Sequence, residues 1–390
     1  MKILHVIPNL TQGGAEQVLI NILPSIQAQG HSCEVAVLEP NLALAPRLAE
    51  HGIPVRVLPT HHRWNLVANA RALRKVVADN GFDVVHAHLF FPAMYTALGG
   101  GGKAIRFVTF HNLDYDYFPP KTPWLKARRW LHGRAMRTGV HQTIAVSRAV
   151  AAHFEQQLSI DQVEMIPNAF PVERLREIAE ENREGAAERY NLPTGPFTIV
   201  THGRAVRAKG HLDLLAAYSL LAREGRTFQA WIIGDGPQAG AIQAAIRDLH
   251  LEEHVTYRGN IPNRDLMGVL SRADLFVSSS HYEGFSLALA EAMAVGLPAV
   301  VTRAGGMVDV VADGEAGVVV PVSDPTSLAR EIGRMMDNPS LRQSTAEKGQ
   351  RRITTEYSAD AVATQLITLY QSTATQLPRS TVEAASYDPA

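Results

Sequence analysis

The stretch LFVSSSHYEGFSLALAEAMAVGLPAVVT, residues 275–302, sets out one unit of the fold. It contains a short β-branched strand, a loop, a helix that is apolar nearly all round and a second strand. Ser286 can cap the helix at its first turn, and the Gly-Leu-Pro turn at 296–298 ends it near Val295. We expect such a helix to be buried. A buried helix between short apolar strands is typical of a parallel sheet with helices on both faces.

The same alternation recurs along the chain. In the first half we predict strands at KILHVI, CEVAVL, DVVHAH, IRFVTF and QTIAVS, and helices at Ala15–Gln29 and Asn65–Asn80. In the second half we predict strands at FTIVTHG, FQAWIIG, VTYRG, LFVSS, PAVVT and AGVVVP, and helices at His211–Glu224, Pro237–His250 and from Pro325 to about Gln371.

These patterns indicate two doubly wound α/β domains that face each other across a cleft, residues 1–171 and 172–357. The segment 167–196 is rich in Glu, Arg and Pro, and we interpret it as a linker with one helix. The polar, unpatterned residues 373–390 are predicted to form a mobile tail.

Composition excludes several classes of protein. The 390 residues carry a net charge of −1, so the chain as a whole has no electrostatic footprint for nucleic acid. Cys33 is the only cysteine, which rules out an internal disulfide and fits a reducing, cytoplasmic setting. The N-terminus does not form a signal peptide, because His5 and Pro8 break a short apolar segment. No uninterrupted apolar run reaches the ~18 residues of a membrane span.

Two carboxylates interrupt the apolar stretch, Glu291 inside the predicted helix and Glu283 just before it. An unpaired buried carboxylate costs several kcal/mol or gives up its charge. Because Glu283 lies off the helix, both side chains can face one ligand, although helical residues eight apart would diverge by about 80°. The free amides from Phe285 to Leu287 would form an anion site, and Glu291 would accept two hydroxyls, as a carboxylate does from a ribose. The alternative is a buried glutamate paired with an arginine.

Cations follow the strand FTIVTHG. Arg204 comes directly after it, and Lys209 comes five residues later, beside Gly210. Ligands of doubly wound sheets bind at the carboxyl ends of strands, so a forked guanidinium and a point-charge ammonium here suit a diphosphate. Arg207 can share this role. The alternative is a solvated basic loop.

Gly13 and Gly14 follow the first strand and open a helix. Two adjacent glycines let the backbone approach a ligand, and amides at a helix N-terminus favour an anion. We therefore expect contact with a phosphate or an acceptor here. The alternative is a plain turn between strand and helix, which needs one glycine at most.

Two motifs imitate other kinds of site. GDGPQA, residues 234–239, follows a strand and matches the dinucleotide-binding pattern GxGxxA, which leaves an NAD-linked oxidoreductase as an alternative function. Asp114 and Asp116 imitate a metal-binding Asp-x-Asp pair, but no other carboxylate lies nearby in the sequence. We expect no metal there.

Histidines gather at the ends of two predicted strands. His86 and His88 lie on one strand face, and His111 is the conceivable third zinc ligand. With no cysteine partner, we expect no zinc. His111 itself ends the strand IRFVTF, which makes it a candidate for positioning or polarising a reacting group.

The segment Lys121–Arg137 mixes basic residues with Trp124, Leu125, Trp130 and Leu131. A basic amphipathic helix of this kind can lie on an anionic bilayer, which would place the protein peripherally on the inner face of the cytoplasmic membrane. The alternative, which tryptophan and leucine usually favour, is a helix docked on its own domain.

Together these residues resemble the family-four retaining glycosyltransferases of the GT-B fold, over about residues 1–372. The resemblance rests on Gly13–Gly14 after the first strand, HAH then TFH, IPN at the linker, GR…KG, GDGP, and E-G-F-S-x-x-x-x-E at Glu283 and Glu291. The linker departs from the family in reading IPNAF where IPNG is frequent. The resemblance implies two Rossmann-like domains and a C-terminal helix, residues 358–372, that packs back on the N-terminal domain.

The resemblance also implies a role for each matching residue. The donor diphosphate would be held by Gly13, Gly14, Arg204, Lys209 and the amides of Gly284, Phe285, Ser286 and Leu287. Glu291 would bind the ribose, and Ile261 would lie beside the base. Glu283 and His111 would act at the donor sugar, near the reacting carbon.

The implied activity is transfer of a sugar from a nucleoside-diphosphate sugar, a UDP-sugar above all, to a hydroxyl of a glycan, lipid-linked or small-molecule acceptor. Such reactions build polysaccharides and glycoconjugates. Retention is described for the family as front-face attack, in which the leaving diphosphate takes the acceptor's proton. No metal cofactor is implied, because paired cations and helix dipoles stabilise the diphosphate. A non-catalytic nucleotide-sugar-binding module on the same scaffold remains an alternative.

Overall fold

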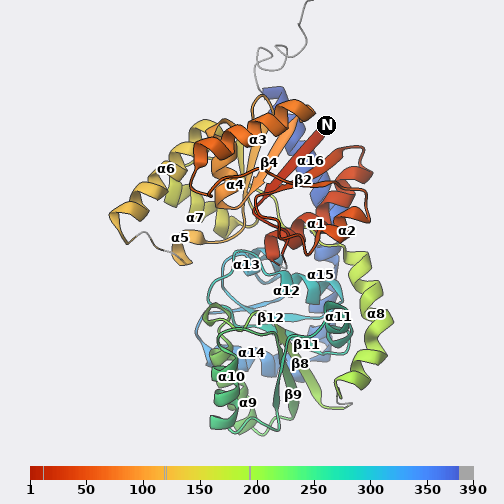
Figure 1. Cartoon of the computed structure of the whole chain (residues 1–390). Coiled ribbons are helices and arrows are strands. Elements are labelled where there is room, and N and C mark those ends of the chain that lie inside the picture. Colours follow the sequence, from red (N-terminus) through yellow and green to blue (C-terminus); the bar gives the residue numbers. More distant parts are fainter. Residues whose placement is uncertain (12, 118, 120, 193–194, 377–390) are drawn as a thin grey trace, which may run out of the picture. The chain divides into compact units, whose positions relative to one another are not determined.

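The chain divides into two compact units in a computed structural model that describes residues 1–11, 13–117, 119, 121–192 and 195–376. Unit 1 comprises residues 1–169 together with the C-terminal helix that begins at Ala359, and unit 2 comprises Phe170–Ser358 (Figure 1). None of the described helices is both long enough and apolar enough to cross a membrane.

Among the described residues, unit 1 contains a seven-stranded parallel sheet in the order β3-β2-β1-β4-β5-β6-β7. The strands are β1 (Lys2–Ile7), β2 (Ser32–Val37), β3 (Val55–Val57), β4 (Val84–His88), β5 (Ile105–Phe110), β6 (Gln142–Ala145) and β7 (Glu164–Met165). The strand order reverses between β1 and β4, as the doubly wound pattern predicted. The sequence did not predict β3 and β7, because segments of three and two residues carry no usable period.

Helices cover both faces of this sheet, because successive side chains of a strand point to opposite faces. On β1, Ile3 and Ile7 join the core beneath α1 (Gly14–Ala28), whereas Leu4 and Val6 join the core beneath α3 (Leu66–Asn80). The other helical segments of unit 1 are α2 (Ala45–Ala49), α4 (Phe90–Tyr95), η1 (Thr96–Gly100), α5 (Asp114–Tyr117), α6 (Pro123–Gly139) and α7 (Arg148–Leu158).

The C-terminal helix α16 (Ala359–Gln376) belongs to unit 1. Its buried residues Val362, Leu366 and Tyr370 share the apolar cluster of α1, and Figure 1 shows α16, in blue, alongside α1. The helix continues to Gln376, past the expected end at residue 372. The remainder of the predicted tail, residues 377–390, lies outside the described residues.

The described part of unit 2 contains a six-stranded parallel sheet in the order β10-β9-β8-β11-β12-β13. The strands are β8 (Phe197–His202), β9 (Phe228–Ile233), β10 (Val255–Gly259), β11 (Leu275–Ser278), β12 (Ala299–Thr302) and β13 (Val318–Val320). The helical segments are α8 (Val172–Arg189), η2 (Arg207–Lys209), α9 (His211–Arg223), α10 (Ala239–Asp248), α11 (Asn263–Leu270), α12 (Leu287–Ala294), α13 (Met307–Val310), η3 (Ala312–Gly314), α14 (Pro325–Asp337) and α15 (Pro339–Glu356).

The one helix predicted in residues 167–196 does form, but it is not part of a linker. α8 is an integral part of unit 2 and packs against α11. Close approach is possible because Gly268 of α11 has no side chain; a Cβ there would lie 2.5 Å from the carbonyl oxygen of Asn182. Arg189 and Tyr190 at the end of α8 both donate hydrogen bonds to the buried carboxylate of Asp265.

The hold of α16 on unit 1 can be tested through Tyr370, which is fully buried and lies 2.6 Å, hydroxyl oxygen to Nδ1, from His86. We expect Tyr370→Phe to lower the free energy of unfolding by about 1–3 kcal/mol, because a buried imidazole nitrogen loses its partner. Thr368→Val, at an exposed position of the same helix, should cost less than about 0.5 kcal/mol. Urea denaturation measures both; equal effects would contradict the assigned role.

Candidate functional site

The carboxyl edge of the unit 2 sheet gathers most of the predicted donor-binding residues. Because its strands are parallel, the loops after β8, β10 and β11 leave the sheet at one edge. Arg204 and Lys209 lie in the first of these loops, Ile261 in the second, and Glu283 in the third, directly before α12. Ile261 is partly exposed there.

An ion pair joins two of these loops. Lys209 Nζ lies 2.8 Å and 3.1 Å from the two carboxylate oxygens of Glu283, with 22% of the lysine side chain and 10% of the glutamate side chain exposed. The backbones also meet, because the amide of His281 donates to the carbonyl of Ala208 at 2.7 Å. Gly210 adopts φ +63° at this junction, and a Cβ there would lie 2.1 Å from the carbonyl oxygen of Ser279. The two loops therefore hold each other in one arrangement.

A third loop, after β12, supports the backbone of Glu283. The amide of Gly306 donates to the carbonyl of Glu283 at 3.0 Å. Gly305 has φ +49°, and a Cβ on it would lie 1.8 Å from that same carbonyl oxygen. Sequence reasoning missed this contact, although the adjacent glycines two residues beyond the strand PAVVT were a signal for a close backbone approach.

Helix α12 forms as predicted, with Ser286 Oγ accepting a hydrogen bond from the amide of Leu289 at 3.4 Å. Six of its eight residues are buried. Phe285, only 9% exposed, packs its ring 5.9 Å from the rings of Phe170 and Tyr357, ring centre to ring centre. These contacts fix the first turn of the helix, whose amides have no acceptor within the helix itself. Gly284 and Leu287 flank this turn.

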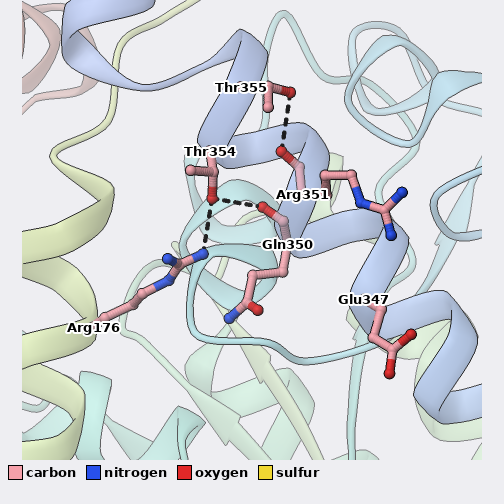
Figure 2. Close-up of a pocket in the computed structure, with 6 residues that line it drawn as sticks. All are labelled: Arg176, Glu347, Gln350, Arg351, Thr354 and Thr355. Atoms are coloured by element: carbon pink, nitrogen blue, oxygen red, sulfur yellow. Dashed lines mark hydrogen bonds between the residues drawn. The ribbon is translucent and has the colours of Figure 1, made fainter.

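The other end of α12 is anchored by α8 and α15. Arg176 Nε donates to the carbonyl of Ala294 at 3.0 Å, and its NH2 group donates to Thr354 Oγ1 at 2.8 Å. Figure 2 shows Arg176 reaching from α8 toward Thr354 and Gln350 of α15, in a pocket of about 350 Å³. A cation that satisfies C-terminal carbonyls also stabilises the helix dipole. We interpret this pocket as an anchor for α12.

Glu291 lies in the second turn of α12 with an unusual set of neighbours. Its carboxylate is 3.6 Å from His202 Nε2, and His202 Nε2 donates to the carbonyl of Ala288 at 3.2 Å. Burial, together with the charge of Lys209, lowers the pKa of His202 to about 4, so this imidazole is neutral at pH 7. Burial raises the pKa of Glu291 to about 7, although 18% of its side chain remains exposed. The alternative, a pair between Glu291 and an arginine, does not occur among the described residues.

Arg204 is exposed, and within the part of the chain that the structure describes its guanidinium makes no ion pair or hydrogen bond. Arg207 is exposed in the same loop. A free, forked cation five residues from Lys209 is available for an anionic ligand at this edge.

The glycines of GDGPQA have a structural role of their own. A Cβ on Gly234 would lie 1.9 Å from the carbonyl oxygen of Gly203, and one on Gly236 would lie 2.6 Å from that of Ala205. The amide of Ala205 also donates to the carbonyl of Asp235 at 2.9 Å. The motif therefore supports the Arg204 loop, and its glycines need no bound dinucleotide to explain them.

In unit 1, α1 opens at Gly14 with Gly13 as its N-cap. A Cβ on Gly13 would lie 2.2 Å from a carboxylate oxygen of Glu16, which is buried and has a pKa raised by that burial. A side chain at position 13 would displace only the flexible end of Glu16, so this contact does not by itself require glycine. Gly14 is exposed at the helix N-terminus, where an amide can meet a ligand.

His111 ends β5 and belongs to a chain of buried imidazoles. His5 Nδ1 lies 3.1 Å from His88 Nε2, and His88 Nδ1 lies 3.1 Å from His111 Nε2. These residues meet because His5 pairs in register with His86 of β4, and His88 pairs with Thr109 of β5. Burial lowers the pKa of His5 to about 3 and of His111 to about 4, and it lowers that of His88 as well. The chain is therefore uncharged at pH 7.

The direction of the hydrogen bonds between these imidazoles follows from His5, the buried end of the chain. His5 Nε2 is buried with no hydrogen-bond partner among the described residues. A proton there would be an orphaned donor, so we assign the proton to Nδ1, which donates to His88. His88 then donates through Nδ1 to His111 Nε2, and His111 carries its own proton on Nδ1.

The third zinc-ligand candidate proposed from the sequence was wrong. The atoms of His5, His86 and His88 lie within 4.8 Å of one another, so the third imidazole comes from β1 and not from His111. His86 already uses Nδ1 toward Tyr370 and Nε2 toward Thr109, each at 2.6 Å. A metal ion would have to displace such bonds. Asp114 lies on the short helix α5, and the side chain of Asp116 lies outside the described residues.

The basic segment forms α6, capped by Thr122. Its C-terminal half docks on unit 1 through buried residues such as His132 and Met136. This half therefore follows the alternative of a helix docked on its own domain. Its N-terminal half keeps Trp124 and Trp130 exposed.

Comparisons with known proteins agree with this geometry. Residues 12–174 match the family model described as Glycosyltransferase Family 4, and residues 182–352 match Glycosyl transferases group 1. The chain belongs to these glycosyltransferases. The family and the GT-B fold class predicted from the sequence are both confirmed, the fold by two parallel Rossmann-like sheets.

Individual relatives cover different shares of the chain. It is 31% identical over 177 residues to a glycogen synthase of Mycobacterium tuberculosis, a match that spans 45% of this chain and 43% of that protein. It is 29% identical over 318 residues to alpha-D-kanosaminyltransferase of Streptomyces kanamyceticus, which covers 78% of this chain and 80% of that protein. HepE of Anabaena, solved in complex with UDP, superposes with a TM-score of 0.79 at 20% identity, over 95% of this chain and all of that one.

The raised pKa of Glu291 predicts a pH-dependent stability for this glycosyltransferase. Between 4.5, the ordinary value, and about 7, the unfolded chain releases the proton while the folded chain keeps it. Stability contributed by this group is therefore present at low pH and is lost as the pH rises through that window, by about 3 kcal/mol at most. We expect Glu291→Gln to unfold like the parent at pH 4.5 and to be more stable at pH 8.

Thermal unfolding from pH 4.5 to pH 8.5 measures this difference, and Glu252→Gln at an exposed position is the control. Parallel curves for the parent and Glu291→Gln would contradict the assignment.

Proposed function

We propose that the protein transfers a sugar, with retention of configuration, from a nucleoside-diphosphate sugar to a hydroxyl of a glycan, lipid-linked or small-molecule acceptor. A UDP-sugar is the proposed donor, which the UDP complex of the structurally similar HepE supports. The observation that carries the proposal is the edge of unit 2 where free Arg204, the Lys209–Glu283 pair and the first turn of α12 come together. Polysaccharide or glycoconjugate biosynthesis in the cytoplasm is the proposed setting.

The diphosphate would bind between Arg204, Lys209 and the amides that open α12. An exposed guanidinium without a partner costs little to recruit, and helix N-terminal amides add partial positive charge. A phosphate that approaches Lys209 competes with Glu283 for the ammonium group. Glu283, released from that pair, would then face the donor sugar.

Glu291 would receive the ribose. A carboxylate that accepts hydrogen bonds from two hydroxyls is stabilised in its charged form, which offsets the desolvation that raises its pKa in the free protein. Ile261 would lie beside the base. A dinucleotide of the NAD type has no comparable support, since the GDGPQA glycines serve the packing of their own loop.

His111 would contact the sugar near the reacting carbon as a neutral imidazole. With Nε2 held by His88, its Nδ1–H is a hydrogen-bond donor of fixed orientation. The acceptor's proton would pass to the leaving diphosphate, whose new charge the cations of unit 2 stabilise. No metal ion is needed in this scheme.

Donor binding is tested by calorimetric titration with UDP. We expect Arg204→Gln to weaken UDP binding about ten- to hundredfold, the equivalent of one or two hydrogen bonds to a charged group. Arg247→Gln, at an exposed position of α10, changes the net charge equally and should leave the affinity unchanged. Equal losses in both variants, or tight binding of NADH without a response to UDP, would overturn the proposal.

The chemistry is tested on a donor chosen by thermal-shift screening of nucleotide sugars, since a bound donor raises the apparent melting temperature. With that donor, we expect hydrolysis or transfer to proceed at the same rate in EDTA as in Mg²⁺. We also expect the product sugar to keep the donor's anomeric configuration by proton NMR. Inversion would contradict retention, and a loss of rate in EDTA that Mg²⁺ restores would contradict metal independence.

A further inference from the structure

An apolar pocket of about 590 Å³ lies on unit 1 between the start of α3, α4 and the N-terminal half of α6. Its lining consists of Trp64, Leu66, Phe90, Met94, Trp124, Ala127, Arg128, Trp130 and Leu131. The volume falls within the ~300–1,000 Å³ of pockets that enclose one small molecule. Trp124 and Trp130 are each 65% exposed, so a large part of this apolar lining faces solvent.

The spacing of the lining residues shows which way α6 faces. Trp124, Ala127, Arg128 and Leu131 follow one another at positions i, i+3, i+4 and i+7, which is one face of a helix. That face borders the pocket and is turned toward α3 and α4. A bilayer would require the apolar stripe on an open, convex surface. The concave arrangement favours a single inserted chain or ring over a membrane surface.

Arg128 is the one charged group in the lining, and its surroundings point to an anion. Its guanidinium lies over the ring of Phe90, 4.4 Å from the ring centre, and 5.9 Å from that of Trp64. Stacking occupies the faces of the guanidinium and leaves its N–H edge to find acceptors. Its Nε is buried, and within the described residues it has no hydrogen-bond partner.

The wider charge pattern agrees. The 17 residues of α6 include five basic side chains and no acidic one. Among the side chains that the structure describes, Asp114 is an acid on which Arg128 acts, and burial raises its pKa to about 6. Because α6 itself carries five cations and no acid, a ligand with an anionic group is favoured at the pocket rim.

The pocket is tied to the histidine chain. β4 ends at His88, which is bonded to His111, and Phe90 two residues later lines the pocket. Leu89 between them adopts φ +68° and ψ 173°, a strained region that is nearly restricted to glycine. The loop after His111 is also fastened to α6, because the Tyr115 hydroxyl lies 2.8 Å from His132 Nδ1. A molecule in the pocket therefore lies near the histidine chain that ends at His111, which is predicted to act near the reacting carbon of the donor sugar.

We propose that this pocket binds the hydrocarbon part of a lipid-linked acceptor, with the phosphate that joins the lipid to the acceptor held at the N–H edge of Arg128. The inference rests on the proposed transferase function and names its acceptor class. It assigns Trp64, Phe90, Trp124 and Leu131 to the hydrocarbon and Arg128 to the phosphate.

The chain carries its own reporter for this site. Three of its four tryptophans line the pocket, and the fourth, Trp231, is buried in β9 of unit 2. The probe is dodecyl phosphate kept below its critical micelle concentration. We expect saturable binding with a blue shift of tryptophan emission, at least tenfold tighter than binding of dodecyl maltoside. Inorganic phosphate alone should cause no shift.

Matched variants identify the groups involved. Ala127→Phe fills the pocket and should abolish the shift, and Arg128→Gln should weaken dodecyl phosphate at least tenfold without changing dodecyl maltoside. Arg71→Gln, an exposed arginine of α3 outside the pocket, should change neither. Far-UV circular dichroism and thermal unfolding of each variant test the folding of unit 1, and UDP titration reports on unit 2.

Four outcomes would overturn the proposal. They are equal affinity for the phosphate and maltoside probes, loss in Arg71→Gln equal to that in Arg128→Gln, binding only to anionic vesicles and never to the monomeric lipid, or no lipid binding at all. The third outcome would assign α6 to a membrane surface. If UDP still binds while no lipid does, the pocket assignment fails and the transferase proposal stands; if UDP fails as well, the transferase proposal fails too.

Discussion

The proposed donor-binding edge of unit 2 depends on one constraint. The carboxyl group of Glu291 is buried on the apolar helix α12. Among the described residues, the basic group nearest to the Glu291 carboxyl is His202, and burial keeps that imidazole neutral. Glu291 therefore has no ion pair there. The helix cannot shift to expose this carboxyl group, because Ser286 caps its start and Arg176 bonds to the carbonyl of Ala294 at its end. In the free protein, the charged form of Glu291 is therefore destabilised by burial at the edge of the sheet. A ligand that offers two hydroxyls removes part of that cost, so the strain of the empty site favours binding.

The two units contribute different physics to the proposed reaction. Unit 2 supplies charge, through free Arg204, the Lys209–Glu283 pair and the amides of a helix start, all on loops that glycines allow to touch. Unit 1 supplies neutral imidazoles and an apolar pocket, with Arg128 as its single cation. Positive charge suits a diphosphate leaving group. An uncharged hydrogen-bond donor such as the His111 side chain can orient a sugar without attracting the diphosphate.

The sequence was informative where a local rule decides the structure. Ser286, the apolar run and the Gly-Leu-Pro stop define α12 without help from the rest of the chain, and the strand patterns predicted every described strand except the short β3 and β7. It was uninformative where the decisive neighbour is distant. Nothing near Glu291 in the sequence points to His202, and nothing near His88 points to His5, since only strand register brings them together. Gly13 shows the same limit, because its contact with the folded-back Glu16 side chain is not visible in the sequence.

The most direct test of this account is the pKa of Glu291 itself, measured by carbon NMR of the labelled carboxyl group with and without UDP. The account predicts a value near 7 in the free protein, as burial requires, and a clear fall when UDP is bound, because ribose hydroxyls stabilise the charged form. A value near the ordinary 4.5 in the free protein, or one that UDP leaves unchanged, would contradict it.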